Sequence, residues 1–284
     1  MNELDSLREQ IRRHEMEIAG LHQELAETNK GVVALYAELD QNALQLREAA
    51  DLKSRFLSYM SHEFRTPLAS ITSVSDILLA RLDGSLTQEQ ERQLRFVQGS
   101  VRELSEMVDD LLDLAKVEAG RISISPQWFE MVDLFSALRG MFRPIVGAGS
   151  VSLVFEEPDQ VPLIYTDDKK LAQILRNFIS NALKFTAEGE VRVSARMLHG
   201  TMIEFAVTDT GIGIAKEHLP ALFSDFVQLD TRLQKRLRGT GLGLSLARKF
   251  AELLGGSVAA ESKLGKGSRF SVLIPSRYSD GAST

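Results

Sequence analysis

Apolar residues recur every seven positions through the first fifty residues of this 284-residue chain. One heptad position, counted from residue 4, is always apolar, whereas the position three residues later mixes apolar and polar side chains. The first set is Leu4, Ile11, Ile18, Leu25, Val32, Leu39 and Leu46, and the second is Leu7, His14, Leu21, Thr28, Leu35, Asn42 and Ala49. A strict repeat of this kind predicts a parallel coiled coil over residues 1–50. A helix lying on its own globular domain is the alternative, although such a helix usually has a wider apolar stripe.

Helical patterning continues past this repeat and predicts a two-helix hairpin over residues 51–121. Pro67 should kink the first helix, the run LDGS forms a turn, and Thr87 with Gln90 makes a capping box for the second helix. Gly120 should end that helix. Its apolar face consists of Leu94, Val97, Val101, Leu104, Val108, Leu111, Leu112 and Ala115. Two such helices cannot bury both apolar faces alone, which predicts that two copies pair as a four-helix bundle.

From residue 122 onward, strand-like and helix-like stretches alternate, which predicts a sheet covered by helices, of the α+β or mixed type. The predicted strands are 151–156, 190–197, 202–209, 257–262 and 269–275, and the predicted helices are 167–185 and 241–256. The predicted parts of the chain are 1–50, 51–121 and 122–277, followed by a tail at 278–284.

The balance of charge argues against a nucleic-acid partner. With 33 basic and 39 acidic residues the formal net charge is -6, so no cationic surplus attracts a phosphate backbone. The chain has no cysteine, which excludes disulfides and thiolate catalysis and favours a cytoplasmic location. No apolar run approaches the roughly 20 residues that cross a bilayer, so we expect no membrane span in this chain.

The segment LRNFISNALKFT presents three polar side chains on one helix face, because Asn177, Asn181 and Lys184 are spaced by four and three residues. Two amide oxygens beside an ammonium group suit Mg²⁺ bridged to phosphates, since this ion takes few protein oxygens and keeps phosphate and water ligands. Exposed Asn and Lys are common on helices, so this segment alone is weak evidence.

The segment DTGIGI follows a predicted strand and contains two glycines. The Asp209 carboxylate can accept a hydrogen bond from an exocyclic amine such as that of adenine. Gly211 and Gly213 would let the backbone approach a ring closely. A plain glycine-rich turn is the simpler interpretation of this segment taken by itself.

A second glycine-rich segment, GTGLGLSLARKF at 239–250, leads into a predicted helix whose free N-terminal amides would suit a phosphate. It matches neither GxxxxGK[ST] nor GxGxxG. The candidate nucleotide-binding residues at its start are Gly239, Thr240, Gly241, Leu242 and Gly243.

The stretch between these two segments combines aromatic residues with positive charge. Phe223 and Phe226 would anchor a mobile lid. The basic residues along it are Arg232, Lys235, Arg236 and Arg238. A polar, basic loop of this length in a compact domain is more often a functional lid than a plain connector. Its cations could offset charge that develops during phosphoryl transfer.

Taken in order, the segments SHEFRTPL, NFISNALKFT, DTGIGI, LFSDFVQ, GTGLGLSLA and GKGSRFSVLIP resemble the H, N, G1, F, G2 and terminal glycine boxes of two-component sensor histidine kinases. The resemblance covers about residues 50–276. It implies an α plus α/β fold, with a dimeric four-helix bundle of the HisKA type followed by a Bergerat-type α/β sandwich that binds ATP. It also implies that Asp209 holds adenine and that Asn181 is the Mg²⁺ ligand, assisted by Asn177 and Lys184.

The same resemblance makes His62 the phosphoacceptor. Histidine suits this role because its reference pKa of about 6.5 leaves a neutral ring nitrogen available to attack a phosphoryl group. Glu63 corresponds to the family's acid that orients or deprotonates the imidazole. Arg65 and Thr66 share the helix face of His62. Thr66 matches a residue that helps to place a hydrolytic water, which gives the hypothesis of phosphatase activity toward a response regulator.

The resemblance implies ATP-dependent autophosphorylation of His62 in a homodimer and phosphotransfer to an aspartate of a separate response regulator. Two alternatives stay open. A degenerate regulatory scaffold should have lost residues such as Asn181 or Asp209, and an ATPase of the wider GHKL group would leave the H box and the hairpin unexplained. We expect an upstream sensor domain or protein to act through residues 1–50. The residues do not decide whether transfer occurs within or between subunits.

Overall fold

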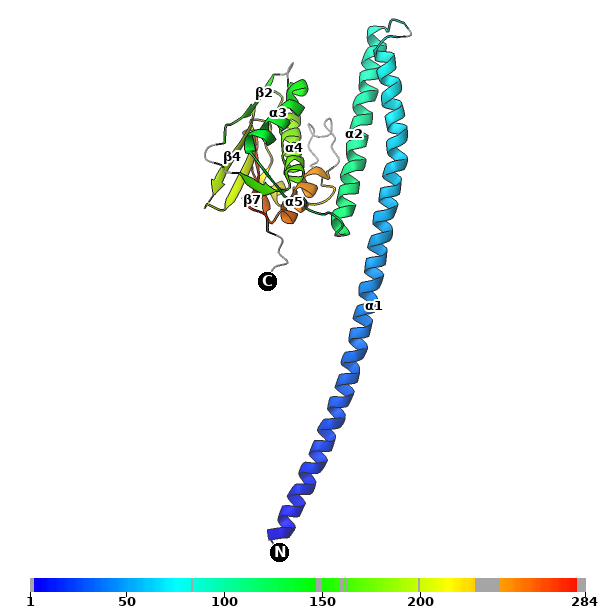
Figure 1. Cartoon of the computed structure of the whole chain (residues 1–284), viewed down its shortest axis with the longest axis vertical. Helices are drawn as coiled ribbons and strands as arrows, with labels where there is room; N and C mark the ends of the chain where they lie inside the picture. The colour runs from blue at the N-terminus through cyan, green and yellow to red at the C-terminus, as the bar shows by residue number, and fades with distance from the viewer. Residues whose placement is uncertain are drawn as a thin grey trace. The chain divides into compact units, whose positions relative to one another are not determined.

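The computed structural model describes residues 3–82, 84–146, 150–158, 161, 163–198, 200–227 and 241–279. By its internal contacts the chain forms two units, Met1–Phe56 and Leu57–Thr284. The boundary between them falls inside one helix, α1 (Glu3–Leu79), which is the longest element in Figure 1. The finer division that the sequence predicts, at residues 50, 121 and 277, stays a prediction.

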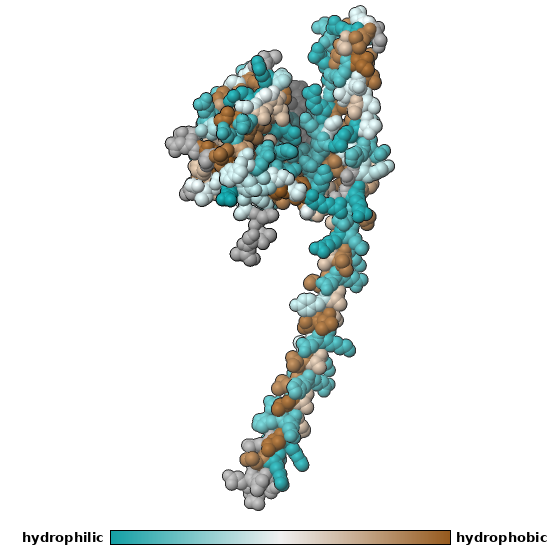
Figure 2. All heavy atoms as spheres, viewed as in Figure 1, coloured by the Kyte–Doolittle hydropathy of each residue, from teal (hydrophilic) through white to brown (hydrophobic). Residues whose placement is uncertain are grey.

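The first unit is helical throughout its described residues. The apolar heptad positions from Ile11 to Leu46 are exposed within a single chain, from 44% at Val32 to 72% at Leu46. Apolar side chains, drawn in brown, recur between hydrophilic ones along this helix in Figure 2. The predicted long helix is therefore confirmed, whereas coiled-coil pairing requires a second chain and stays a prediction.

A helical hairpin opens the second unit. Helix α1 continues through Pro67, and α2 runs from Gln88 to Glu118. The predicted capping box is confirmed, because Thr87 Oγ1 accepts from Gln90 N at 3.2 Å and Gln90 Oε1 accepts from Thr87 N at 2.9 Å. Gly120 has a φ of +64° directly after the end of α2, in agreement with its predicted role. The kink expected at Pro67 stays a prediction.

A mixed sheet with covering helices follows the hairpin. Its elements are β1 (Gln127–Phe129), α3 (Met131–Val146), β2 (Val151–Phe155), β3 (Ile164–Thr166), α4 (Asp168–Phe185), β4 (Gly189–Leu198), β5 (Met202–Asp209), the 3-10 helix η1 (Lys216–Ala221), α5 (Gly243–Leu253), β6 (Ser257–Lys263) and β7 (Gly267–Pro275). The five strands and two helices that the sequence predicts are all present, with ends that differ by three residues at most. Helix α3 and strands β1 and β3 were not predicted.

The main sheet has the strand order β2-β4-β5-β7-β6. Strand β2 runs parallel to β4, and the other neighbouring strands are antiparallel. Strands β1 and β3 form a separate antiparallel pair. Because β5 and β7 lie side by side, the loop after β5 meets the hairpin between β6 and β7, and this meeting point carries the site described below.

Helices α3, α4 and α5 cover one face of the main sheet, as Figure 1 shows. The core lies between them and the sheet, and its largest fully buried side chains include Phe178 from α4, Phe205 from β5 and Phe250 from α5. Helix α4 is amphipathic, with buried residues at spacings of three and four such as Leu171, Ile174 and Leu175. This arrangement confirms the predicted α/β sandwich.

Candidate functional site

Asp209 ends β5 and is 5% exposed. Its Oδ1 accepts two backbone hydrogen bonds, from Gly211 N at 2.8 Å and from Ser268 N at 3.2 Å. In the part of the chain that the structure describes, Oδ2 accepts none. Burial raises the pKa of Asp209 above its usual value, and the two N–H groups oppose that rise. The carboxylate is thus held rigidly and keeps one oxygen for an outside donor.

The glycines after Asp209 are required first by backbone packing. A side chain on Gly211 would collide with the Phe185 carbonyl at the end of α4, and one on Gly213 would collide with the Lys263 carbonyl. Gly213 also has a φ of +66°. Hydrogen bonds join this loop to both neighbours, from Ile212 N to Phe185 O and from Gly265 N to Ile212 O. The predicted close approach to a ring is untested, because backbone contacts already account for these glycines.

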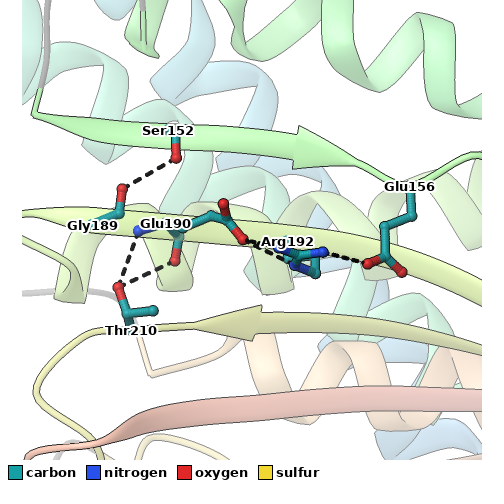
Figure 3. A network of polar contacts seen from close by, with 6 residues as sticks. All are labelled: Ser152, Glu156, Gly189, Glu190, Arg192 and Thr210. Atoms are coloured by element: carbon teal, nitrogen blue, oxygen red, sulfur yellow. Dashed lines mark hydrogen bonds and ion pairs between the residues drawn. The ribbon is translucent and has the colours of Figure 1, made fainter.

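Thr210 fastens the start of this loop to β4, as Figure 3 shows. Its N–H donates to Glu190 O at 3.1 Å, and its Oγ1 accepts from Glu190 N at 3.0 Å. Arg192 then bridges Glu190 and Glu156, so ion pairs continue the network toward β2. Asp209 is therefore positioned from two sides, because the next residue, Thr210, is bound to Glu190 of β4 and Ser268 of β7 donates to Asp209 itself.

The three predicted polar residues of α4 lie in different surroundings. Asn177 Nδ2 donates to Gly243 O at 3.0 Å, which ties α4 to the first turn of α5. Asn181 is half-buried one turn further on. Burial lowers the pKa of Lys184, while the charges of Glu103 and Glu106 on α2 act to raise it. The structure therefore brings the predicted cation-binding face of α4 beside the predicted phosphate-binding start of α5.

The segment after η1 is anchored by one of its two predicted aromatic residues. Phe223 packs on the core and meets the Phe270 ring edge to face, with 6.5 Å between centroids. Phe226 is 63% exposed and has a φ of +61°, so its predicted role as an anchor is wrong. The chain turns away from the core after Leu222 and Phe223, and residue spacing alone did not reveal this.

Part of the predicted nucleotide site falls outside the described residues. These residues are Arg238, Gly239 and Thr240, together with the lid cations Arg232, Lys235 and Arg236. In the described continuation Gly241 has a φ of +71° and Leu242 is buried, and the predicted contact of these residues with a nucleotide stays a prediction. Gly243 begins α5 and lies against the Asn177 side chain.

His62 is exposed on α1 and lines a shallow depression together with Arg65 and Thr66. The predicted shared face of these three residues is confirmed. Thr66 Oγ1 donates to the His62 carbonyl at 3.3 Å, and Arg65 Nη2 lies 2.8 Å from Asp109 Oδ1 on α2. Glu63 is also exposed but does not line the depression.

Ser268, Ser262 and Thr186 were not among the predicted site residues, and the first two lie next to Asp209, because Ser268 contacts Asp209 and Ser262 contacts Ser268. Ser262 Oγ accepts from Ile214 N at 2.7 Å and lies 2.9 Å from Ser268 Oγ. Thr186 follows α4, and its buried Oγ1 has no hydrogen-bond partner within the described residues. The GKGSRF segment contained the signal for Ser268, whereas its contact with Asp209 depends on the pairing of β5 with β7.

The residues around Asp209 fit the adenine base of a nucleotide. A base with an exocyclic amine offers a donor for Asp209 Oδ2. Within the described residues Asp209 Oδ1 accepts both hydrogen bonds, so Oδ2 can accept one from a ligand or from water. The polar arrangement is therefore compatible with a binding site for the base, and that role of Asp209 stays a prediction.

Two family models match the chain. Residues 52–120 match the His Kinase A (phospho-acceptor) domain, and residues 166–278 match the histidine kinase-, DNA gyrase B- and HSP90-like ATPase family. An uncharacterized sensor-like histidine kinase of Rhizobium meliloti is 37% identical over 249 residues, which are 87% of this chain and 47% of that protein. The autoinducer 2 sensor kinase/phosphatase LuxQ of Vibrio vulnificus is 36% identical over 247 residues, which are 83% of this chain and 28% of LuxQ.

Among solved structures, full-length ShkA in complex with AMPPNP matches with a TM-score of 0.65 and 29% identity, over 81% of this chain and 47% of that one. The chain belongs to the two-component sensor histidine kinase family. It spans less than half the length of these relatives. Within the described residues, no helix is both long and apolar enough to cross a membrane.

Proposed function

We propose that this chain is a histidine kinase core that transfers the γ-phosphoryl group of ATP to His62. One observation carries the proposal: the chain combines an exposed histidine on a helical hairpin with a buried carboxylate that keeps one oxygen for a ligand. Both features lie within the two matched family regions. A plain ATPase of the wider family would need only the second feature.

The chain's own residues supply binding, orientation and acceptance. Asp209 accepts a hydrogen bond from the exocyclic amine of the base, and the first backbone amides of α5 face the phosphates. Asn181 is the proposed Mg²⁺ ligand, with Asn177 and Lys184 beside it on α4. ATP, when bound, supplies the phosphoryl group. A neutral ring nitrogen of His62 accepts that group, and Glu63 is proposed to orient the ring.

A second proposed activity is the dephosphorylation of a response regulator, with Thr66 placing the attacking water. The Thr66 hydroxyl lies on the same exposed depression as His62, and LuxQ is named a sensor kinase/phosphatase. A Thr66→Ala variant should retain autophosphorylation and lose most of its regulator phosphatase activity. Unchanged dephosphorylation of a phosphorylated regulator by this variant would disprove the assignment.

The proposed partners follow from surfaces that a single chain leaves open. Exposed apolar side chains on the hairpin, such as Phe64, Ile71 and Val74, support a homodimer that pairs two hairpins into a bundle. A response regulator is the proposed phosphoryl acceptor, and a sensor domain or protein is the proposed input through the first unit. The location is proposed to be cytoplasmic, on the absence of cysteine.

The decisive experiment is labelling with γ-labelled ATP. Wild type should acquire label that is labile in acid and stable in base, as expected for a phosphoramidate bond. His62→Gln should acquire none, whereas the matched control His218→Gln, at another exposed histidine, should label normally. Persistent label on His62→Gln would refute the acceptor, and release of free phosphate without protein label would favour the ATPase alternative.

The nucleotide site has its own test. Asp209→Asn keeps an oxygen for Gly211 N and Ser268 N but turns an N–H group toward the incoming amine, so ATP binding should weaken by at least about tenfold. Calorimetric titration with ATP measures this change, and Asp133→Asn on exposed α3 surface is the matched control.

Mixing His62→Gln with Asn181→Ala then decides between transfer within and between subunits, since recovered label requires transfer between them.

A further inference from the structure

Arg65 forms an ion pair across the hairpin, three positions after His62. Its Nη2 lies 2.8 Å from Asp109 Oδ1, so the contact joins α1 to α2. The two side chains are 55% and 58% exposed. Exposed ion pairs contribute little to stability, because water solvates the separated charges well. Arg65 can therefore exchange Asp109 for another anion at small cost.

Arg65 also belongs to the surface around His62. The residues that line the depression are His62, Arg65, Thr66, Ala69, Ser70 and Ser73. Arg65 is the only one of these six with a permanent charge. Thr66 and Ser70 already donate their hydroxyls to helix carbonyls. A guanidinium carries five N–H donors, and a single contact with Asp109 leaves most of them for a second partner.

Arg65 lies among charged side chains of α2. Arg65 also lines a second cavity, and it is the one residue common to both surfaces. Four carboxylates of α2 line that cavity, Glu106, Asp109, Asp110 and Asp113, and its other cations are Lys116, Lys169 and Arg176. The four carboxylates face four cations when Arg65 is counted, and Arg65 is the one of these cations that also lines the depression of His62, where it can meet a phosphoryl group.

We propose that Arg65 is a phosphoryl-binding residue. Its guanidinium pairs with Asp109 while His62 is unmodified, and it pairs with the phosphoryl oxygens once His62 carries phosphate. This inference rests on the proposed function, since it takes His62 as the acceptor. The planar guanidinium fork matches two phosphoryl oxygens. Asp109 is then the resting partner that keeps the fork beside His62, and Arg65 orients the phosphoryl group for its next transfer.

The test measures the phosphoryl group directly in the full chain. Phosphoramidate phosphorylates histidine chemically, and the ³¹P signal of His62 is the one missing from His62→Gln. A nearby guanidinium favours the doubly ionised phosphoryl group and so lowers its pKa, which means that Arg65→Gln should raise that pKa by roughly one unit. Arg65→Lys should restore part of the shift, and Asp109→Asn should lower the pKa below that of wild type.

Arg81→Gln is the matched control. It removes another ion pair across the hairpin, Arg81 Nη2 to Glu91 Oε2, also at 2.8 Å but next to the turn. The phosphoryl pKa should stay at its wild-type value in this variant. Equal pKa values in wild type and Arg65→Gln, or an equal shift in Arg81→Gln, would overturn the proposal. Because phosphoramidate bypasses the nucleotide site, failure of ATP-dependent kinase activity would leave this readout intact.

Discussion

The two units of the chain satisfy their apolar residues in opposite ways. The catalytic part of the second unit encloses Phe178, Phe205 and Phe250 completely within one chain. The helix of the first unit leaves most of its described heptad residues, such as Ile18 and Leu25, more than half exposed. Burial of apolar surface is the main stabilising contribution to folding. The sheet domain of the second unit can therefore fold within one chain, whereas we expect the helix of the first unit to depend on a partner helix.

The largest expected effect is in the catalytic core. Phe178→Ala should lower the free energy of unfolding by about 3–5 kcal/mol, because a fully buried ring leaves a cavity. Denaturant unfolding of the second unit's sheet domain, followed by circular dichroism, measures the change. Phe226→Ala removes an equal ring at an exposed position and should change stability by less than about 0.5 kcal/mol. Equal losses in the free energy of unfolding of the two variants would show that burial does not distinguish Phe178 from Phe226.

The same comparison predicts a concentration-dependent effect in the first unit. Ile18→Asp places a charge at a heptad position and should raise the dissociation constant of the dimer about a hundredfold, or about 2.7 kcal/mol. Sedimentation equilibrium on the full chain measures this constant. Gln23→Asp adds the same charge on an exposed residue outside the heptad stripe and is the control. An unchanged constant in Ile18→Asp would mean that this helix does not pair through that stripe.

Asp110 on α2 links packing to pH. Burial raises its pKa to about 6, the charge of Arg176 opposes the rise, and Asp113, Glu106 and Asp109 add to it. The folded state thus holds the proton of Asp110 more tightly than the unfolded state does. The contribution of this group to the free energy of unfolding is therefore largest at acidic pH and falls as pH rises from about 4 to beyond 6.

Asp110→Asn should remove this pH dependence and raise the free energy of unfolding at pH 7 by on the order of 2 kcal/mol. Urea unfolding at a series of pH values measures it, with Asp133→Asn at an exposed site as the control. A variant with the wild-type pH profile would show that Asp110 is not the responsible group.

The smallest expected effect is at the hairpin turn. Thr87→Ala deletes the side chain that caps α2 and should cost about 1 kcal/mol of stability, because the amide of Gln90 loses its acceptor. Ser85→Ala, in the same turn but outside the capping box, should cost far less. Thermal unfolding compares the two variants. Equal melting temperatures would show that the capping box adds nothing measurable to the hairpin.

Local pattern was sufficient to predict most elements of this chain. The heptad repeat, the capping box at Thr87 and the stop at Gly120 depend on neighbours within a few residues. The repeat predicted the long helix α1, and the other two signals predicted the start and the end of α2. The five strands of the main sheet were also visible in the sequence as short runs of apolar and β-branched residues. Helix α3 was missed, since Gly140 and Pro144 interrupt its pattern, and β1 and β3 are too short to show a period.

The sequence by itself was enough to predict which residues carry the chemistry, because the motifs around His62, Asn181 and Asp209 are contiguous and appear in family order. Tertiary structure alone decided what surrounds them. Ser268 reaches Asp209 only because β7 pairs with β5, and Arg65 reaches Asp109 only because α2 folds back along α1. These contacts join residues 59 and 44 positions apart, and no local pattern of side chains encodes which distant residues the fold brings together.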